Sequence, residues 1–453
     1  MAEHRSVIIF FGVFDMIIGR KPSAAICTLG CRVNQYESAA VSDELEALGF
    51  EMRDFTEKCD VYIINTCAVT AESERKSRQM IRRAAKTNPD AFVIVMGCFS
   101  QLDAEKIAKT DGVRYVCGNR NKLGAAEAAA KLCRGEKIDG CDILDVTQAP
   151  IEDMKISGFG RTRAYVKIED GCDNNCAYCI IKKARGAVVS RKTDDICDEI
   201  RGLADRGYKE IVLTGIEVAS FGKDTGEKLT DLVRRVGENE KIARIRLASL
   251  EPSVLTKDFV DALAAEPKFM PSFHLSLQSG SSRVLALMRR KYNAAQVIEK
   301  ARYIKKKMPS VTFTADVIVG FPDESEDDFI QTCNLVSEIG FLHLHIFPFS
   351  ARKGTDAAAM KNQIDPAVKS DRAARLKALG EKMSAEIYKK SAPGGKARKV
   401  LFETPHGAYQ VGHTPELLEI YVKSKTPLQN GIFDVVPTEY AGGKLYGTVK
   451  EEK

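Results

Sequence analysis

Three cysteines in one short segment are the residues best suited to do chemistry. Cys172, Cys176 and Cys179 have the spacing C-x3-C-x2-C, and Tyr178 stands directly before the last of them. Three thiolates can hold three irons of a four-iron cluster and leave the fourth iron without a protein ligand. An open metal position distinguishes a reactive site from one that only stabilises a fold. A zinc site or reduced structural thiols are the alternative interpretation of this spacing taken alone.

Three further cysteines each follow an apolar run that is predicted to be a buried strand. They are Cys31, Cys67 and Cys98. In a parallel sheet the loops after the carboxyl ends of the strands meet at one edge, where ligands bind. The sequence therefore predicts a second metal site, and the alternative is that small cysteines fill tight turns. The remaining cysteines lack ligand-like spacing and are predicted to be structural: Cys27, Cys59, Cys117, Cys133, Cys141, Cys197 and Cys333.

Composition indicates a globular protein without a membrane-spanning segment. The chain has 453 residues, 44% hydrophobic and 29% charged, which predicts two to four domains with sizeable cores. A net charge of +6 permits a nucleic-acid partner without demanding one. Thirteen cysteines without a signal peptide favour metal ligation in a reducing cytoplasm over a disulfide scaffold. The apolar stretch 7–19 is too short to span a membrane, and we interpret residues 1–21 as an extension of unknown role.

Elements around the cysteines follow a β-α alternation in the first third of the chain. Apolar runs at 24–27, 61–65, 92–96 and 113–116 indicate strands, and 34–48, 71–86 and 104–109 indicate amphipathic helices. This order predicts an open parallel α/β sheet over residues 22–135, followed by a linker at 136–157.

A second β-α series at 158–390 predicts a full or partial (β/α) barrel. Its strands are expected at 163–169, 210–214, 244–248, 273–277, 312–319 and 342–347, with helices such as 193–206 and 293–307 between them. The loop with Cys172 follows the first strand, where barrel chemistry occurs.

The tail at 391–453 changes character. Pro393 and two glycines end a charged helix at 366–390, and short alternating runs follow at 399–403, 418–422, 431–436 and 444–449. They predict a small closed β-barrel of the OB kind, a fold that often binds nucleic acid. The fold class is thus α/β with a C-terminal β-barrel.

Nine motifs in order carry a resemblance to a known family. They are TLGCRVNQYES (28–38), NTCAVT (65–70), MGCFSQ (96–101), GCDNNCAYCIIKKARG (171–186), VLTGIEVASFG (212–222), RLASLEP (246–252), LSLQSGSSRVLALMRRKY (275–292), DVIVGFPDESEDDF (316–329) and HIFPFSARKGT (345–355). The chain resembles the radical S-adenosylmethionine (SAM) methylthiotransferases from residue 22 onward. The resemblance implies an auxiliary [4Fe-4S] cluster on the first cysteine triplet, a radical-generating [4Fe-4S] cluster on the second, and a TRAM domain as the tail. Two departures are Lys182, where relatives usually carry proline, and a missing arginine near Val188.

Residues at the strand ends are expected to bind SAM. Thr214, Gly215 and Glu217 are predicted to meet its methionine amino end. The remaining predicted contacts are Gln278 and Ser279 at the ribose, Val319 (with 317–321) near the adenine, and Tyr178 beside the cluster. Ordinary turn chemistry is the alternative for each.

Basic residues crowd the predicted barrel loops and suggest RNA contact. The predicted RNA-binding residues are Lys182, Lys183, Arg185, Arg191, Arg289, Arg290 and Arg352, within a wider set that adds Arg161, Arg163, Lys291 and Lys353. Cations on the loop face that also carries the clusters would suit a phosphate backbone. A solvated charged face is the alternative.

The resemblance implies a tRNA methylthiotransferase that converts N6-threonylcarbamoyladenosine beside the anticodon to its 2-methylthio form. TLGCRVNQYES is most similar to that branch, whereas YGCQMN is typical of the isopentenyladenosine branch and LGCPKN of the ribosomal-protein branch. The same chemistry on isopentenyladenosine tRNA or on a ribosomal protein is one alternative, and a non-catalytic iron–sulfur RNA-binding protein is the alternative of another class. Expected partners are tRNA and a flavodoxin- or ferredoxin-like electron donor, with a monomeric enzyme. Because a threonylcarbamoyl group carries a carboxylate, its pocket should offer a cation.

Overall fold

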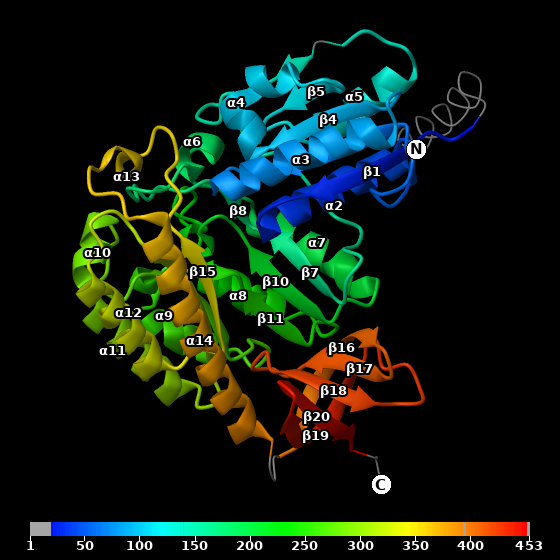
Figure 1. The fold of residues 1–453 in the computed structure, drawn as a ribbon. Coiled ribbons are helices and arrows are strands. Elements are labelled where there is room, and N and C mark those ends of the chain that lie inside the picture. Colours follow the sequence, from blue (N-terminus) through cyan, green and yellow to red (C-terminus); the bar gives the residue numbers. More distant parts are fainter. Residues whose placement is uncertain (1–19, 139, 393–395, 451–453) are drawn as a thin grey trace.

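The computed structural model describes residues 20–138, 140–392 and 396–450. Figure 1 shows the first α/β sheet, a central partial barrel and a C-terminal β-barrel, in chain order from one end of the molecule to the other. Most of the predicted extension, residues 1–19, lies outside the described residues. No helix within the described residues is both long enough and apolar enough to cross a membrane.

The first sheet is parallel, with the strand order β2-β1-β3-β4-β5-β6. Its strands are β1 (Ser23–Thr28), β2 (Glu51–Met52), β3 (Val61–Thr66), β4 (Phe92–Gly97), β5 (Val113–Cys117) and β6 (Cys141–Asp142). Its helices are α2 (Arg32–Ala47), α3 (Ala71–Thr87), α4 (Cys98–Ala108) and α5 (Gly124–Cys133). Separate apolar clusters occupy the two faces of the sheet, which explains why β3 is buried at every position.

Three details differ from the expected elements of this region. Helix α4 begins at Cys98 rather than at 104, because Gly97 (φ +107°) turns the chain directly from β4 into the helix. Helix α5 was not predicted, since its alanine-rich sequence has little contrast between an apolar and a polar face. Strand β6 pairs with β5 although it lies within the segment predicted as a linker.

The central part is a partial barrel of two parallel sheets, β11-β10-β7 and β12-β13-β14-β15. Its strands are β7 (Arg163–Lys167), β10 (Glu210–Thr214), β11 (Arg244–Leu247), β12 (Ser249–Leu250), β13 (Ser272–Gln278), β14 (Thr312–Val319) and β15 (His343–Pro348). The helices α7 (Thr193–Asp205), α8 (Leu229–Gly237), α9 (Lys257–Ala265), α11 (Ala294–Lys307), α12 (Glu326–Ile339) and α14 (Pro366–Ser391) follow the strands. The fold class is therefore the one predicted.

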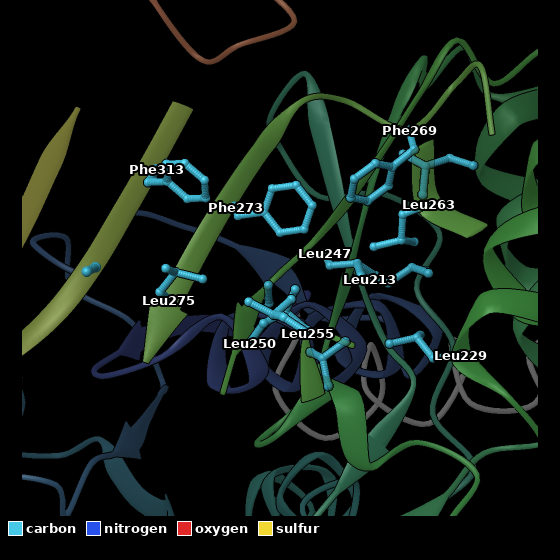
Figure 2. Close-up of a cluster of buried hydrophobic side chains, with 14 of the residues drawn as sticks. Leu213, Leu229, Leu247, Leu250, Leu255, Leu263, Phe269, Phe273, Leu275 and Phe313 are labelled. Carbon is cyan, nitrogen blue, oxygen red and sulfur yellow. The ribbon is translucent and has the colours of Figure 1, made fainter. Parts of the chain in front are cut away.

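Alternation along the central strands separates a core face from an inner face. Phe273 and Leu275 of β13 pack in the main apolar core with Phe313 and the leucines of neighbouring strands, as Figure 2 shows. The intervening residue His274 is only partly buried. Because successive side chains of a strand point to opposite faces, His274 and its equivalents on β14 and β15 lie on the inner face of the barrel.

The C-terminal part is a closed barrel of five strands in the order β16-β17-β18-β20-β19. They are β16 (Arg398–His406), β17 (Tyr409–His413), β18 (Glu419–Lys423), β19 (Ile432–Ala441) and β20 (Lys444–Val449). The predicted barrel is confirmed, with β17 as an additional strand. It contacts the start of the central strands, where Arg244 Nη2 donates to the Lys399 carbonyl at 2.6 Å and Thr312 donates to the Glu416 carbonyl.

Candidate active site

Cys172, Cys176 and Cys179 lie in the loop after the short strand β8 (Glu169–Asp170). Gly171 opens this loop at φ +81°, and a Cβ there would lie 1.9 Å from the Ala187 carbonyl oxygen, so only glycine fits. Cys172 N donates to the Gly186 carbonyl at 3.1 Å, which anchors the loop. Burial, together with the neighbouring thiols, raises the pKa of Cys172 to about 12 and of Cys179 to about 11. Three neighbouring thiolates would repel one another, and the positively charged core of an iron–sulfur cluster would offset that repulsion. The arrangement therefore fits a cluster site.

Cys31, Cys67 and Cys98 meet at the carboxyl edge of the first sheet. Cys31 follows β1, Cys67 follows β3, and Cys98 begins α4 after β4. A Cβ on Gly30 would lie 2.9 Å from both Cβ and Sγ of Cys67, so the glycine leaves the space that Cys67 occupies beside Cys31. Burial and the charges of Cys98 and Cys31 raise the pKa of Cys67 to about 11. These three residues can also hold a cluster.

The two triplets lie close to one another. Cys98 is among the groups whose charge raises the pKa of Cys179, after burial and Cys176. Arg185, in α6 (Ile181–Arg185) directly after the second triplet, donates from Nε to Cys98 Sγ at 3.3 Å. A side chain of the central barrel therefore touches a thiol of the first sheet. A reacting group held between the triplets would be near both.

Arg185 belongs to a buried network of charges between the first sheet and the barrel. Its Nη1 donates to Glu37 Oε1 and Asp170 Oδ1, both at 2.9 Å, and its Nη2 donates to Asn34 Oδ1 at 2.6 Å. Lys167 Nζ also reaches Glu37 Oε1, at 2.8 Å. The Arg185 side chain is 0% exposed.

Four of the arginines predicted to bind RNA are buried, and for them the prediction is wrong. Arg185 is paired as described, and Arg191 Nη1 donates to Glu199 Oε2 at 2.7 Å. Arg352 is buried against Glu74. Arg290 donates to Cys176 Sγ at 3.2 Å and pairs with a carboxylate, so it contacts the cysteine site. Their guanidinium groups are engaged by partners inside the protein and are not available to a phosphate.

The other predicted RNA contacts remain on the surface. Lys182 and Lys183 are exposed, and Lys183 Nζ donates to the Gly354 carbonyl at 2.7 Å. Arg289 is exposed and pairs with Asp356.

The predicted methionine end of the SAM site is a buried carboxylate pocket. Burial and the charge of Glu251 raise the pKa of Glu217 to about 7. A Cβ on Gly215 would lie 1.9 Å from Glu169 Oε1, so this position also needs glycine, and Thr214 is buried at the end of β10. A buried carboxylate whose pKa is raised by a neighbouring carboxylate favours a bound cation, and the ammonium of an amino acid fits this requirement.

The predicted contacts on β13 and β14 are brought to the same end of the barrel, with two corrections. Gln278 ends β13 at φ +65°, a strained conformation for a residue with a side chain. Ser279 is completely buried against Thr332, with 3.3 Å between the hydroxyls, and Val319 is buried in the main core. The side chains of Ser279 and Val319 are therefore unavailable to a ligand. Ile318 instead packs against the apolar cluster around Phe321, which Tyr178 also contacts.

Several residues on the inner face of the barrel were missed from the sequence. His274, Asp316 and His345 lie on three adjacent strands, and their ligand atoms are within 4.8 Å of one another. Phe347 on β15 is 41% exposed although it is a large apolar side chain. Arg32, directly after Cys31, lies with its guanidinium 5.5 Å from the centre of the Tyr165 ring. The alternation His343-Leu344-His345-Ile346-Phe347 is the sequence signal that could have found this face.

Comparison with known proteins places this arrangement in a family. Residues 23–118 match uncharacterized protein family UPF0004, and residues 166–336 match the Radical SAM superfamily. The threonylcarbamoyladenosine tRNA methylthiotransferase MtaB of Bacillus subtilis is 37% identical, over 88% of this chain and 90% of that protein. The same-named protein of Chlamydia pneumoniae is 38% identical, over 87% and 90%. The chain belongs to the MtaB-like methylthiotransferase family.

Family membership makes this protein a sulfur-inserting transferase of the radical SAM superfamily, with SAM and a [4Fe-4S] cluster as implied cofactors. A tRNA-2-methylthio-N(6)-dimethylallyladenosine synthase of Clostridium perfringens is 34% identical over 84% of this chain and 86% of that protein. Among solved structures, the radical SAM methyltransferase TsrM of Kitasatospora setae has a TM-score of 0.54 at 14% identity, covering 75% of this chain and 77% of that one. That likeness supports the fold of the methylthiotransferase.

Proposed function

We propose that this methylthiotransferase adds a methylthio group to N6-threonylcarbamoyladenosine beside the anticodon of tRNA, using two [4Fe-4S] clusters. The observation that carries the proposal is the Arg185–Cys98 contact at 3.3 Å, which brings a cysteine triplet of the first sheet next to that of the barrel. An enzyme with one cluster would not need a second set of three thiols at this position. The closeness of the triplets suits a substrate that must meet both.

Bound at Cys172, Cys176 and Cys179, the cluster with SAM would supply a one-electron cleavage that makes a 5′-deoxyadenosyl radical. The chain itself binds and orients the reactants. Glu217 and Glu251 would receive the ammonium of SAM, and Tyr178 with Ile318 would cover its apolar side. Arg290, which donates to Cys176 Sγ at 3.2 Å, would orient that side chain as an iron ligand.

A surface for RNA is supported by the C-terminal barrel. Tyr409, Tyr421 and Tyr446 form a group with ring centres 5.5–6.1 Å apart. Lys444 Nζ lies 4.8 Å from the Tyr421 ring, and Lys423 Nζ lies 5.6 Å from the Tyr409 ring. Single-stranded RNA loops bind aromatic faces with cations between them. The tyrosine patch would therefore provide RNA contacts in addition to those of the exposed Lys182 and Lys183.

Iron analysis of the reconstituted enzyme tests the number of clusters. Alanine at Cys172, Cys176 and Cys179 together should leave about half of the iron and sulfide, and alanine at all three of the other triplet should do the same. Alanine at Cys27 and Cys141 together is the matched control, because neither residue belongs to a triplet, and it should keep all of the iron. Complete loss of iron from either triple variant, with an unchanged circular dichroism spectrum, would contradict two separate sites.

Substrate choice is tested with two tRNA preparations, one carrying threonylcarbamoyladenosine and one carrying isopentenyladenosine. Mass spectrometry of the nucleosides should find the methylthio group only on the first. Product only on the second, or only on a ribosomal protein, would overturn the substrate while leaving the reaction in place. The absence of 5′-deoxyadenosine under reductant would instead support the non-catalytic alternative.

A further inference from the structure

Arg32 is a half-buried cation at the site that has no carboxylate partner among the described residues. It follows Cys31 of the first triplet, and its guanidinium lies 5.5 Å from the centre of the Tyr165 ring. An arginine stacked on an aromatic ring keeps its hydrogen-bonding fork free for a planar anion. A free guanidinium at a reaction site therefore suggests a bound carboxylate or phosphate.

Arg32 stands at the seam where the first sheet meets the open side of the barrel. Tyr165 belongs to β7, the first barrel strand, and β7 packs against α2, whose first residue is Arg32. His345, on the last strand β15, has its pKa lowered by burial, by His343 and also by the positive charge of Arg32. Arg32 is thus close to both edges of the partial barrel, beside a cysteine of the first triplet.

The other cations predicted near the site are not free to bind an anion there. The buried arginines are already paired with carboxylates, as described above. Lys182, Lys291 and Lys353 have no such partner in the parts of the chain that the structure describes, but they are exposed on the surface. Arg161 is also exposed and stands before β7, at the opposite end of that strand from the cysteines.

We infer that Arg32 binds the carboxylate of the threonylcarbamoyl group and thereby selects the substrate. This inference rests on the proposed function and names the residue that reads the modified base. C2 of the adenine has to lie between the two triplets, and the carboxylate is separated from C2 only by the ring and a short chain. A cation beside Cys31 is therefore at the right place to receive it.

The groups that surround Arg32 are compatible with an anionic ligand. Asp316, the nearby carboxylate, is engaged by His274, with 3.2 Å between Oδ2 and Nε2. His274 Nδ1 is in turn 2.8 Å from Thr314 Oγ1. His343 lies beside His345, with ring centres 4.5 Å apart, and both imidazoles can donate hydrogen bonds without adding negative charge.

The experiment changes the cation and the carboxylate in turn. Wild-type enzyme, Arg32→Gln and Arg32→Lys are each given tRNA with threonylcarbamoyladenosine and the same tRNA with its threonyl carboxylate converted to the methyl ester. Loss of a charge-assisted hydrogen bond predicts that the ester raises the wild-type KM about tenfold to a hundredfold. Arg32→Gln should bind acid and ester equally, as weakly as wild type binds the ester, and Arg32→Lys should recover part of the difference. Equilibrium binding of the two tRNAs, measured without reductant, should give the same pattern.

The outcomes separate failure of the inference from failure of the proposed function. Iron content of the variants equal to that of wild type shows that the site is intact. Equal KM values of wild type for acid and ester would overturn the inference, and so would an Arg32→Gln variant that weakens both tRNAs by the same factor, because Arg32 would then bind a phosphate. If wild-type enzyme makes product only on isopentenylated tRNA, the proposed substrate itself is wrong.

Discussion

The buried Glu37 is expected to be essential for the contact between the first sheet and the barrel. Its side chain is 0% exposed, and it accepts hydrogen bonds from Lys167, Arg185 and Lys122. Although burial acts against ionisation, these three cations hold the pKa of Glu37 well below its ordinary value. The change Glu37→Gln keeps the shape of the side chain and removes its charge.

The magnitude follows from what the change leaves behind. Lys167 and Arg185 would retain Asp170 as a partner, whereas Lys122, which is 0% exposed, would lose the carboxylate that it contacts. Removing one partner from a buried ion pair costs about 3–5 kcal/mol, because the remaining charge is desolvated without compensation. We expect the free energy of unfolding to fall by that amount.

Urea unfolding followed by far-ultraviolet circular dichroism measures the effect, since the chain has no tryptophan to report by fluorescence. Glu46→Gln on the same helix is the control, because Glu46 is exposed, and it should change stability by less than about 0.5 kcal/mol. The double change Glu37→Gln with Lys122→Met removes one surplus cation and should recover part of the loss. A loss below about 1 kcal/mol for Glu37→Gln, or no recovery in the double variant, would refute this account of the network.

Three other predictions use single sites. Cys67→Ala should keep reductive cleavage of SAM and lose the methylthiolated product, as measured by liquid chromatography of 5′-deoxyadenosine and of tRNA nucleosides; loss of both would contradict separate roles for the triplets. Phe347→Ala should weaken tRNA binding by about 1–3 kcal/mol if the exposed ring stacks on a base, whereas Phe347→Tyr should bind normally. Burial opposes ionisation of Glu403, but the hydrogen bond from His413 and the charge of Arg163 lower its pKa to about 2 from 4.5. A carboxylate with a lowered pKa stabilises the folded protein above pH 4.5, and this contribution is lost as the pH falls toward 2. Acid should therefore release the C-terminal barrel from the central one, which a proteolysis assay would detect. Glu403→Gln should show no such pH dependence.

The cysteine sites were predictable because their signal is local. Spacing identifies Cys172, Cys176 and Cys179, and the position of Cys31, Cys67 and Cys98 after apolar runs places them at one sheet edge once the strands are parallel. The same reasoning located Glu217 at the end of β10. Backbone topology alone decides these positions, so a sequence with clear periodicity is sufficient.

The arginines were not predictable because their environment is set by distant residues. Arg185 pairs with Glu37, which is 148 positions away, and Arg163 pairs with Glu403, which is 240 positions away. A loop cation next to a metal motif looks the same in sequence whether it faces solvent or a buried carboxylate. Arg32 shows the reverse case, since within the described part of the chain it has no carboxylate partner and stacks on Tyr165.

The charges of the buried network between the first sheet and the barrel lead to a last prediction about the first cysteine triplet. Arg120, Lys122, Lys167 and Arg185 are at most 2% exposed, and the ion pairs of these four cations in the network go to two buried carboxylates, Glu37 and Asp170. The network therefore carries surplus positive charge, and a thiolate at Cys98, which Arg185 contacts, would compensate part of it. Ligation of iron by cysteine requires that thiolate, so filling the first triplet should stabilise the seam as well as the site.

Thermal unfolding before and after reconstitution measures this coupling. Reconstitution should raise the unfolding temperature of the wild type more than that of Arg185→Met, because the variant lacks the cation that the Cys98 thiolate compensates. Arg191→Met is the matched control, since Arg191 is also buried (5% exposed) but pairs with Glu199, and it should show the wild-type increase. Iron content must be the same in all three proteins for the comparison to hold. An equal increase in wild type and Arg185→Met would mean that the charges of the seam and the first triplet are independent, and that Arg185 serves only the packing of the barrel against the first sheet.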